Sequence, residues 1–419
     1  MKKALGHILS AILAVCILFG CVKDDEYFTG KRFSRVMLVY TAAYNNLSSE
    51  INSNISDLAR SVLPLESGDK CVLVFTHNSK TDYDFTTPTN PCLVRLYSDW
   101  EGNNHRDTVM VMEPDAKATD PYTINYVLDY VKEHYPSDHY GLIYSSHGSG
   151  WTPEGYYNSP SSYSSTSKRR GEQLRDLKDI PEYVNGPAVK SIGASMHSSG
   201  DKTVTYETDL MEFAAAIPYH LDYIVLDACL MGGIETAYEL REKADKIVFS
   251  QAEILSAGFP YSNMTLRLLR GGLDVEGVAE DYYDYYQNSP WRSATVSVVD
   301  CRYLDELKDC CNALFSKYRS AIAAVDASQV QGFFRMGRCW FYDLEDILVK
   351  SGISDEDLAG FRGIMDNLIT YKAHTARILD TFDINTFCGL SMYLPSKGSS
   401  YLDSYYGKLA WQKGTGLVN

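Results

Sequence analysis

Short apolar runs recur along this chain, and segments with helical periodicity separate several of them. The runs are too short for helices and lie at 35–40, 71–76, 108–112, 140–145, 222–227, 246–249 and 294–299. Helical patterns occupy 50–63, 122–134, 230–242 and 274–287. This alternation predicts βαβ units and an α/β fold built on a mainly parallel sheet.

The pattern changes after residue 302. Helical periodicity then dominates at 303–325, 343–350 and 355–372, and one more apolar run follows at 388–394. We therefore expect a sheet domain at 35–302 and a mostly helical C-terminal subdomain at 303–419, with the late strand returning to the sheet.

A polar stretch at 152–206 interrupts the sheet domain. Its first part is rich in serine and has no apolar period, and Lys168, Arg169 and Arg170 follow directly. A long polar loop inside a compact domain is usually functional or disordered.

The first residues predict a secretory leader at 1–21. Lys2 and Lys3 precede an apolar segment too short for a comfortable membrane span. The leader ends in a sequence that resembles a bacterial lipobox, so we expect lipidation of Cys21 and a membrane anchor; an ordinary signal peptide with an incidental cysteine is the alternative. An acidic run opens the expected tether at 22–34 and resembles the surface-export signals of some Gram-negative lipoproteins. These features indicate an envelope lipoprotein, in the outer membrane and facing outward.

Charge and cysteine usage narrow the function further. The formal net charge is −15, which argues against a nucleic-acid partner and suits a positively charged substrate. The ten cysteines include no CxxC pair, so a zinc site is not expected. No cofactor is expected otherwise, and the sequence leaves calcium open.

Two of the apolar runs end in reactive side chains. The first continues into His147, Gly148 and Gly150. The glycines allow the backbone to approach a ligand closely, and Gly148 can supply an N–H group to an oxyanion. His77 also follows an apolar run but has no flanking glycines, and His197 lies in the polar stretch, so both are weaker candidates.

The second run leads into Asp227 and Cys229. A helix predicted from Leu230 places Cys229 near a helix N-terminus, where the dipole lowers the pKa of a thiol. Cys301 follows a similar run but starts a helix without glycine, which indicates scaffold. Because parallel strands end at one sheet edge, a histidine and a cysteine there would form the base and nucleophile of a cysteine peptidase.

The segments Ser146–Trp151 and Leu226–Met231 resemble the two signature segments of the clostripain family of cysteine peptidases, which shares its fold with caspases and gingipains. The runs Ala294–Leu304 and Gly389–Pro395 also resemble segments of that family. The resemblance implies a caspase-like αβα sandwich. It assigns His147 as general acid and base, Cys229 as nucleophile, and the N–H groups of Gly148 and Cys229 as oxyanion donors.

The resemblance also implies endopeptidase cleavage of peptides or proteins after arginine or lysine at P1. Asp227 would then lie in the S1 pocket and pair with the basic side chain; a helix cap is its alternative role. Glu253 and Asp281 are both candidates for a second acidic residue. Some relatives require calcium, and no calcium loop is legible in this sequence.

Self-cleavage is a further implication of the resemblance. His147 and Cys229 stand 82 residues apart, against about 50 in caspases, and the polar stretch accounts for the extra length. Many relatives mature by a cut after a basic residue between the two segments. Lys168, Arg169 and Arg170 are thus the expected processing site, and a solvated basic cluster is the alternative.

Two other function classes remain for comparison. A surface lipoprotein of the same fold could bind peptide or glycan without cleaving it, and 32 tyrosines would supply contact surface; the presence of both reactive residues argues against this. A serine or metal hydrolase is disfavoured because neither G-x-S-x-G nor H-E-x-x-H occurs.

Overall fold

A nine-stranded sheet forms the centre of the molecule in the computed structural model, in the order β14-β11-β10-β9-β5-β1-β2-β3-β4. The structure describes residues 31–81, 87–157, 160, 163, 173–175, 194–199, 202–395 and 397–417. The strands of the large sheet are β1 (Arg35–Ala43), β2 (Lys70–Asn78), β3 (Cys92–Ser98), β4 (Asn104–Val111), β5 (Tyr140–Ser145), β9 (Leu221–Asp227), β10 (Ala244–Phe249), β11 (Thr295–Asp300) and β14 (Ile369–His374).

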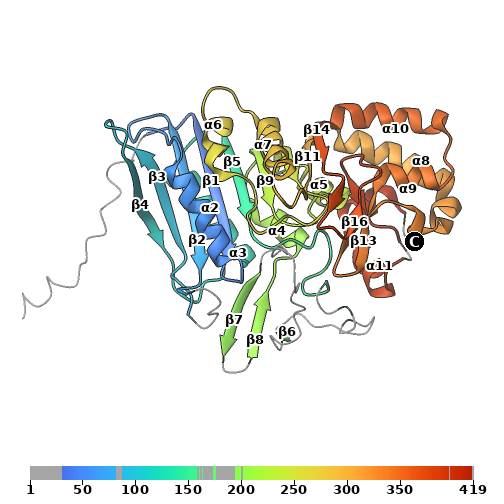
Figure 1. Ribbon diagram of the computed structural model, residues 1–419, viewed down its shortest axis with the longest axis horizontal. Helices are drawn as coiled ribbons and strands as arrows, with labels where there is room; N and C mark the ends of the chain where they lie inside the picture. The colour runs from blue at the N-terminus through green and yellow to red at the C-terminus, as the bar shows by residue number, and fades with distance from the viewer. Residues whose placement is uncertain are drawn as a thin grey trace, which may run out of the picture.

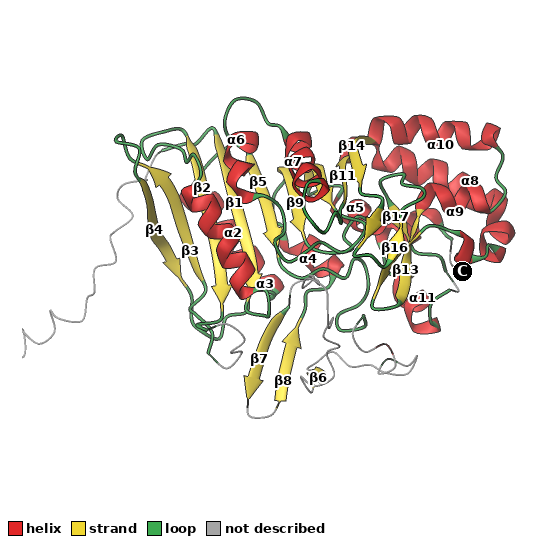
Figure 2. Cartoon of the chain, in the orientation of Figure 1, coloured by secondary structure: helices red, strands yellow, loops and turns green. Residues whose placement is uncertain are grey.

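The middle of the sheet is parallel. Strands β2, β1, β5, β9 and β10 all run in one direction, and antiparallel strands extend the sheet on both sides. The parallel strands therefore end at one edge, the lower one in Figure 2. Residues of β5 are buried without alternation, as expected for a strand covered on both faces.

Helices cover both faces of this sheet. One layer, in front of the sheet in Figure 1, holds α2, α6 and α7; the short 3-10 helix Tyr261–Asn263 connects α2 to α6 by contacts with both. The other layer holds α3, α4 and α5, with α4 in contact with both of its neighbours. The front layer is α2 (Ser48–Arg60), α6 (Met264–Leu268) and α7 (Val275–Gln287); the back layer is α3 (Pro121–His134), α4 (Leu210–Ala216) and α5 (Ile234–Leu240). The predicted α/β fold, with a mainly parallel sheet between helices, is confirmed.

The C-terminal part adds helices and a small second sheet. Its helices are α8 (Leu304–Ala324), α9 (Leu344–Lys350), α10 (Asp355–Leu368), α11 (Ser400–Tyr406) and α12 (Ala410–Thr415). Its strands are β12 (Gly332–Arg335), β13 (Arg338–Asp343) and β17 (Ser391–Met392), with a separate pair of β15 (Arg377–Ile378) and β16 (Phe382–Asp383). A single apolar cluster joins this part to the large sheet, reaching from Phe33 to Leu417.

The expected return of 388–394 to the large sheet is wrong. Only Ser391–Met392 is a strand there, and it pairs with β13. Strand β14 makes the return instead, antiparallel to β11. The helix expected to reach residue 372 ends at Leu368, because the β-branched Ile369 and Thr370 begin that strand.

The polar stretch at 152–206 contains regular structure that the sequence pattern did not predict. Strands β6 (Gln173–Arg175), β7 (Ser195–Ser199) and β8 (Lys202–Tyr206) form a small antiparallel sheet, and β7 and β8 project below the large sheet in Figure 1. Leader and tether up to residue 30 lie outside the described residues, so Cys21 is not placed. Among the helices that are placed, none has the length and apolarity to cross a bilayer.

Candidate active site

The ends of β5 and β9 bring the two reactive segments together. Ser145 pairs in register with Asp227 on the neighbouring parallel strand, so His147 and Cys229 follow at the same level. A Cβ atom built on Gly148 would stand 2.2 Å from the carbonyl oxygen of Cys229 and 2.6 Å from its nitrogen. The backbones of the two segments are therefore in direct contact at the sheet edge.

His147 is held by an asparagine from a third strand end. Its Nε2 lies 2.6 Å from Oδ1 of Asn46, and its side chain is otherwise buried. Because an amide oxygen only accepts, this orientation of Asn46 assigns the proton to Nε2 and leaves Nδ1 as the acceptor nitrogen of the neutral ring. Asn46 follows β1, the parallel neighbour of β5. No local motif marks it, and only the strand order shows that it reaches the site.

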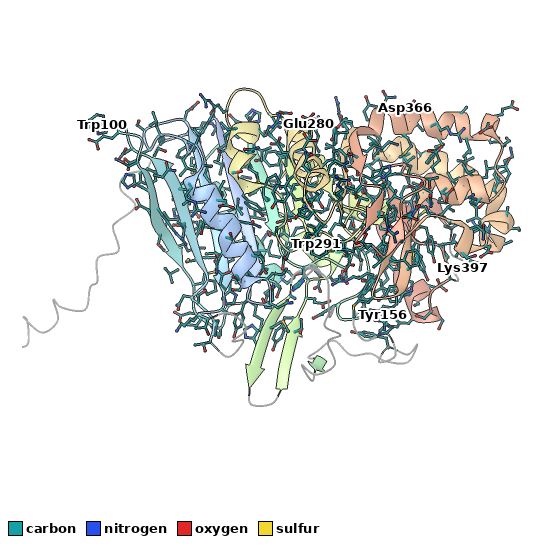
Figure 3. All side chains as sticks on the ribbon, in the orientation of Figure 1. Trp100, Tyr156, Glu280, Trp291, Asp366 and Lys397 are labelled. Carbon is teal, nitrogen blue, oxygen red and sulfur yellow. The ribbon has the colours of Figure 1, made fainter. Side chains whose placement is uncertain are left out.

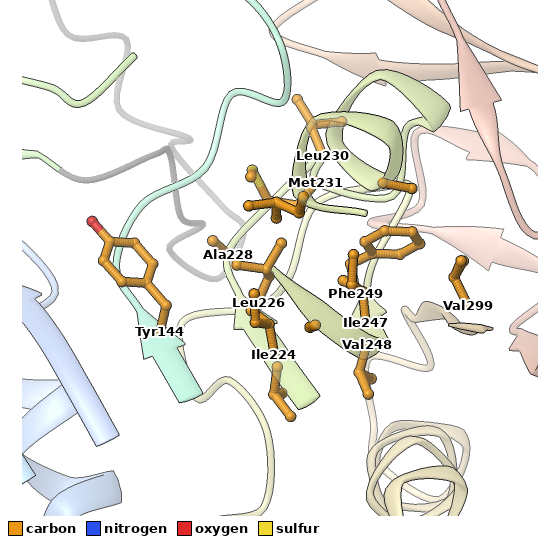
Figure 4. Packing of buried hydrophobic residues seen from close by; sticks show 14 of the residues in the cluster. Tyr144, Ile224, Leu226, Ala228, Leu230, Met231, Ile247, Val248, Phe249 and Val299 are labelled. Carbon is orange, nitrogen blue, oxygen red and sulfur yellow. The ribbon is translucent and has the colours of Figure 1, made fainter. Parts of the chain in front are cut away.

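Cys229 does not lie at a helix N-terminus, so that expectation is wrong. Helix α5 begins only at Ile234, and Leu230 adopts a left-handed conformation with φ 60°. The N–H groups of Leu230 and Gly232 donate to the carbonyls of Ala252 and Ser250, which holds this segment against the loop after β10 in a non-helical path. Figure 4 shows Leu230 and Met231 packed beyond the end of β9.

The sulfur of Cys229 instead faces the loop after β10. It accepts the N–H of Ile254 at 3.1 Å, and its S–H lies 3.5 Å from the carbonyl oxygen of the same residue. The N–H donors expected near Cys229 were those of a helix start, whereas the N–H group that reaches its sulfur comes from a loop. Cys229 has an exposed fraction of 0%, so the site is closed in this conformation.

An open cleft of about 470 Å³ lies elsewhere, at the opposite end of the parallel strands. Arg35 and Asp222 line it and form an ion pair across it, and Asp300 at its rim pairs with Arg302. Cys301 follows β11, which runs antiparallel to β10, and so lies at this far edge. The cleft gives no access to Cys229.

Asp227 is fully buried at the end of β9. Its Oδ2 accepts hydrogen bonds from Ser145 Oγ at 2.9 Å and from the Tyr261 hydroxyl at 3.0 Å. Burial, reinforced by the Asp227 carboxylate, raises the pKa of Tyr261 well above its usual value, so the phenol stays a donor. The alternative role of Asp227 as a cap is wrong, because α5 starts seven residues later.

The two candidates for a second acidic residue lie in different places. Glu253 is buried beside the site, where its Oε1 lies 3.2 Å from Nε of Arg335. Burial raises the pKa of Glu253 to about 7, and the guanidinium opposes that shift. Asp281 instead binds Arg267 within the α6–α7 layer, with contacts of 2.7 and 3.0 Å.

Hairpin β12–β13 holds the segment that follows His147. Arg335 Nη1 donates to the Gly148 carbonyl at 2.8 Å, and Arg338 Nη1 donates to the Tyr157 carbonyl at 2.6 Å. Gly150 has φ +62°, and a Cβ there would stand 2.4 Å from the ring of Phe341. Tyr156, labelled in Figure 3, lies on this side of the molecule and stacks on a tyrosine of α11. Nothing in the sequence around Arg335 indicated this role.

The expected processing site cannot be placed in the structure. The processing residues Lys168, Arg169 and Arg170 lie outside the described residues. Across the ranges that are described, no group of three or more His, Cys, Asp or Glu side chains is arranged to hold a metal ion.

Comparisons with known proteins agree with one another. A family model described as the Clostripain family matches residues 39–180 and 200–336. Clostripain from Hathewaya histolytica is 25% identical over 163 residues, 38% of this chain, and the match spans 26% of that relative's length.

Two solved structures share the fold over most of the chain. An inactive zymogen C11 protease from Parabacteroides distasonis has a TM-score of 0.72 and 25% identity, covering 91% of this chain and 98% of that one. A secreted C11 cysteine protease from Bacteroides thetaiotaomicron, iotapain, has a TM-score of 0.71 and 24% identity, covering 92% and 99%.

Proposed function

This chain belongs to the clostripain family of cysteine peptidases, and we propose that it is an endopeptidase with Cys229 as nucleophile and His147 as general acid and base. The observation that carries the proposal is the pairing of β5 with β9, which sets Gly148 against the backbone of Cys229. Only a few residue types can act as a base and a nucleophile at neutral pH, and His147 and Cys229 follow neighbouring strands at this edge.

The proposed reaction transfers the acyl group of the substrate first to the sulfur of Cys229 and then to water. The thiol of Cys229 gives its proton to Nδ1 of His147, the sulfur bonds to the scissile carbonyl carbon, and the carbonyl π electrons move onto oxygen. The oxyanion accepts hydrogen bonds from the N–H groups of Cys229 and Gly148. As the C–N bond breaks, His147 protonates the leaving amine, and a thioester remains. Water then attacks the thioester while His147 takes its proton, and the thiol and a carboxylic acid are released.

Asn46 has an orienting role in this scheme. Its Oδ1 accepts a hydrogen bond from Nε2–H of His147, which keeps Nδ1 as the basic nitrogen and fixes the plane of the ring. A third group that orients the base is a common part of such sites, and it acts on tautomer and geometry.

We propose that the substrate carries arginine or lysine at P1 and that Asp227 pairs with it. The acidic charge of the chain, −15, also favours cationic substrates. In the closed conformation Ser145 and Tyr261 donate to the Asp227 carboxylate, so a bound guanidinium or ammonium would join or replace these hydroxyl donors.

A latent form fits the closed site. Cys229 is covered, and the relative from Parabacteroides distasonis is described as an inactive zymogen. We propose that a cut at Lys168, Arg169 or Arg170, in the stretch between the two reactive segments, precedes full activity. Changing all three to alanine should leave one band on a denaturing gel, whereas two bands of the original sizes would place the cut elsewhere.

Export to the cell envelope through a lipid on Cys21 remains part of the proposal, and the secreted relative from Bacteroides thetaiotaomicron is consistent with export. Mass spectrometry of the mature protein would report the lipid and any internal cut together. A mature N-terminus other than a lipidated Cys21 would contradict the anchor.

The central test compares two cysteines on opposite edges of the sheet. Cys229→Ala should abolish hydrolysis of an arginine- or lysine-based chromogenic peptide. Cys301→Ala, whose thiol is also buried but lies at the far edge, should keep the wild-type rate. A wild-type rate in Cys229→Ala refutes the proposed nucleophile.

Specificity is tested with Asp227→Asn, which keeps the shape of the side chain and removes its charge. The variant should lose the preference for basic P1 residues in a peptide library. Its Cys229 should still be alkylated by iodoacetamide. Retained arginine selectivity would place the S1 acid elsewhere.

A further inference from the structure

Arg335 stands at the tip of a hairpin, yet its side chain is buried in the site. It ends β12, and the turn that follows has Met336 at φ 52° and Gly337 at φ 70°. Side chains beside such turns usually reach solvent, whereas Arg335 has an exposed fraction of 6%. Its guanidinium lies over the ring of Tyr157, with 5.2 Å to the ring centroid.

The guanidinium joins two parts of the site that are distant in sequence. Its Nη1 donates to the Gly148 carbonyl at 2.8 Å, and its Nε faces Glu253 Oε1 at 3.2 Å. The contact with Glu253 is an ion pair without hydrogen-bond geometry, so the planar guanidinium combines one hydrogen bond to a carbonyl with one charge contact to a carboxylate. Gly148 in turn touches the backbone of Cys229.

Stability alone gives a weak reason for this arrangement. Removing two charges from water costs much of what their attraction returns, and apolar replacements of a buried pair are often neutral or stabilising. The pair lies where geometry matters to the reaction, because it fixes the peptide unit next to one expected oxyanion donor.

We propose that Arg335, held by Glu253, is a positioning residue that fixes the Gly148 peptide against Cys229, so that the C-terminal hairpin completes the active site. This inference rests on the proposed peptidase function. It also assigns Glu253 to Arg335 and leaves Asp227 as the acid that meets a basic P1 side chain.

The first experiment measures steady-state kinetics on the processed full-length protein. Arg335→Ala should lower kcat on the order of a hundredfold, the typical effect of losing one oxyanion donor, with a much smaller change in KM. Arg335→Lys should recover little, because an ammonium lacks the fork, whereas added ethylguanidine should restore part of the rate to Arg335→Ala.

Arg338 provides the matched control. It is the next arginine of the same hairpin and donates to a carbonyl of the same segment, at Tyr157. Arg338→Ala should therefore keep kcat within about threefold of the wild type. A change of that size corresponds to no more free energy than one ordinary hydrogen bond contributes. Equal losses in both variants would show a general loosening of the hairpin and would overturn the specific role of Arg335.

A second measurement does not depend on activity. Amide hydrogen exchange over 148–151 should be faster in Arg335→Ala than in Arg338→Ala. Unchanged exchange overturns the anchoring, whether or not the protein cleaves peptides. An inactive wild type with the expected exchange pattern overturns only the peptidase proposal.

The direction of the kinetic change settles one competing explanation. If the guanidinium merely filled the place of a substrate side chain, Arg335→Ala would raise activity, and that result overturns the positioning role. Should Arg335→Ala fail to fold, Glu253→Gln keeps the shape of the acid, removes the partner charge, and should show the same fall in kcat.

Discussion

Gly148 is the point at which the two reactive segments come closest, and only a residue without a side chain fits there. A Cβ would overlap the carbonyl oxygen of Cys229 at 2.2 Å, and that neighbour is backbone, which cannot rotate away. The contact makes the position of His147 depend on the path of the Cys229 segment. Glycine at this place is therefore a requirement of packing, independent of its proposed role as an oxyanion donor.

Gly148→Ala should accordingly lose both stability and activity. Forcing one methyl group into this contact should cost about 1–3 kcal/mol of unfolding free energy and most of the peptidase rate. Gly360 in α10 is a matched control, because a Cβ there meets nothing within 4 Å. Gly360→Ala should stabilise the helix by about 0.5–1 kcal/mol. Urea unfolding of both variants tests the contrast, and equal stabilities would contradict it.

His77 shows how the same residue type behaves at the same sheet edge when no described residue gives its ring a hydrogen bond. It is the last residue but one of β2, is fully buried, and has its ring centroid 5.1 Å from that of Tyr44. Burial lowers the pKa of His77 to about 3, and the nearby His197 adds to the shift. A histidine held neutral in this way is a structural residue. This agrees with the sequence analysis, in which His77 is a weaker candidate for the base than His147.

The pH dependence of stability should carry the signature of His77. In the folded protein its ring stays neutral down to about pH 3, whereas an unfolded chain binds a proton below about pH 6.5. The unfolded state is thus favoured as pH falls through this window, by up to about 1.4 kcal/mol per pH unit. When denaturant unfolding is measured from pH 7 to pH 4, the free energy of unfolding should fall less steeply with pH in His77→Phe than in the wild type. Parallel curves for the variant and the wild type would exclude His77 as the cause.

At the scale of elements, strand ends were easier to predict than helix starts. The apolar runs at 140–145 and 222–227 match β5 and β9 almost residue for residue, because a strand buried on both faces is a continuous apolar run. The start of α5 was misplaced by four residues. Hydrogen bonds to Ser250 and Ala252, which lie in another loop, hold the preceding segment in a non-helical path, and no local pattern encodes them.

The residues that sequence reasoning missed share this long-range origin. Asn46 reaches His147 only because β1 lies beside β5, and Arg335 reaches Gly148 from 187 positions further along the chain. The meeting of His147 and Cys229 could be predicted, since each follows a recognisable strand by two residues. Its supporting contacts depend on packing between elements, which the sequence shows only once the topology is known.

Hairpin β12–β13 supports the site by packing as well as by hydrogen bonds. Phe341 is fully buried, and its ring lies against Gly150 and Trp151. Phe341→Ala should cost about 3–5 kcal/mol and should lower kcat, because the segment after His147 loses its support. Trp100 is a control of similar size at the β3–β4 turn, 86% exposed and labelled in Figure 3. Trp100→Ala should stay within about 0.5 kcal/mol of the wild type, and a comparable loss in both variants would contradict this account.

Across the whole molecule, the sheet domain and the C-terminal part share one apolar core. Strand β14 belongs to the C-terminal part but forms the edge of the large sheet, beside β11. In the other direction, Gly233 forms a bridge with Ser391 of the small sheet. The boundary predicted at residue 302 therefore marks a change of pattern along the sequence. Contacts between the two parts cross it at the edge of the large sheet and beside the site.

Cooperative unfolding tests this interdependence. The full chain should unfold in one calorimetric transition, because separating the two parts would expose apolar surface on both. A chain ending at Arg302 lacks β14 and would leave β11, all of whose residues are buried in the complete protein, as an open apolar edge. Such an edge promotes aggregation, so the shortened chain should be insoluble or show no cooperative transition. Two separate transitions in the full chain, or a soluble shortened chain with a sharp transition, would mean that the sheet domain folds alone and that the hairpin only docks onto a finished site.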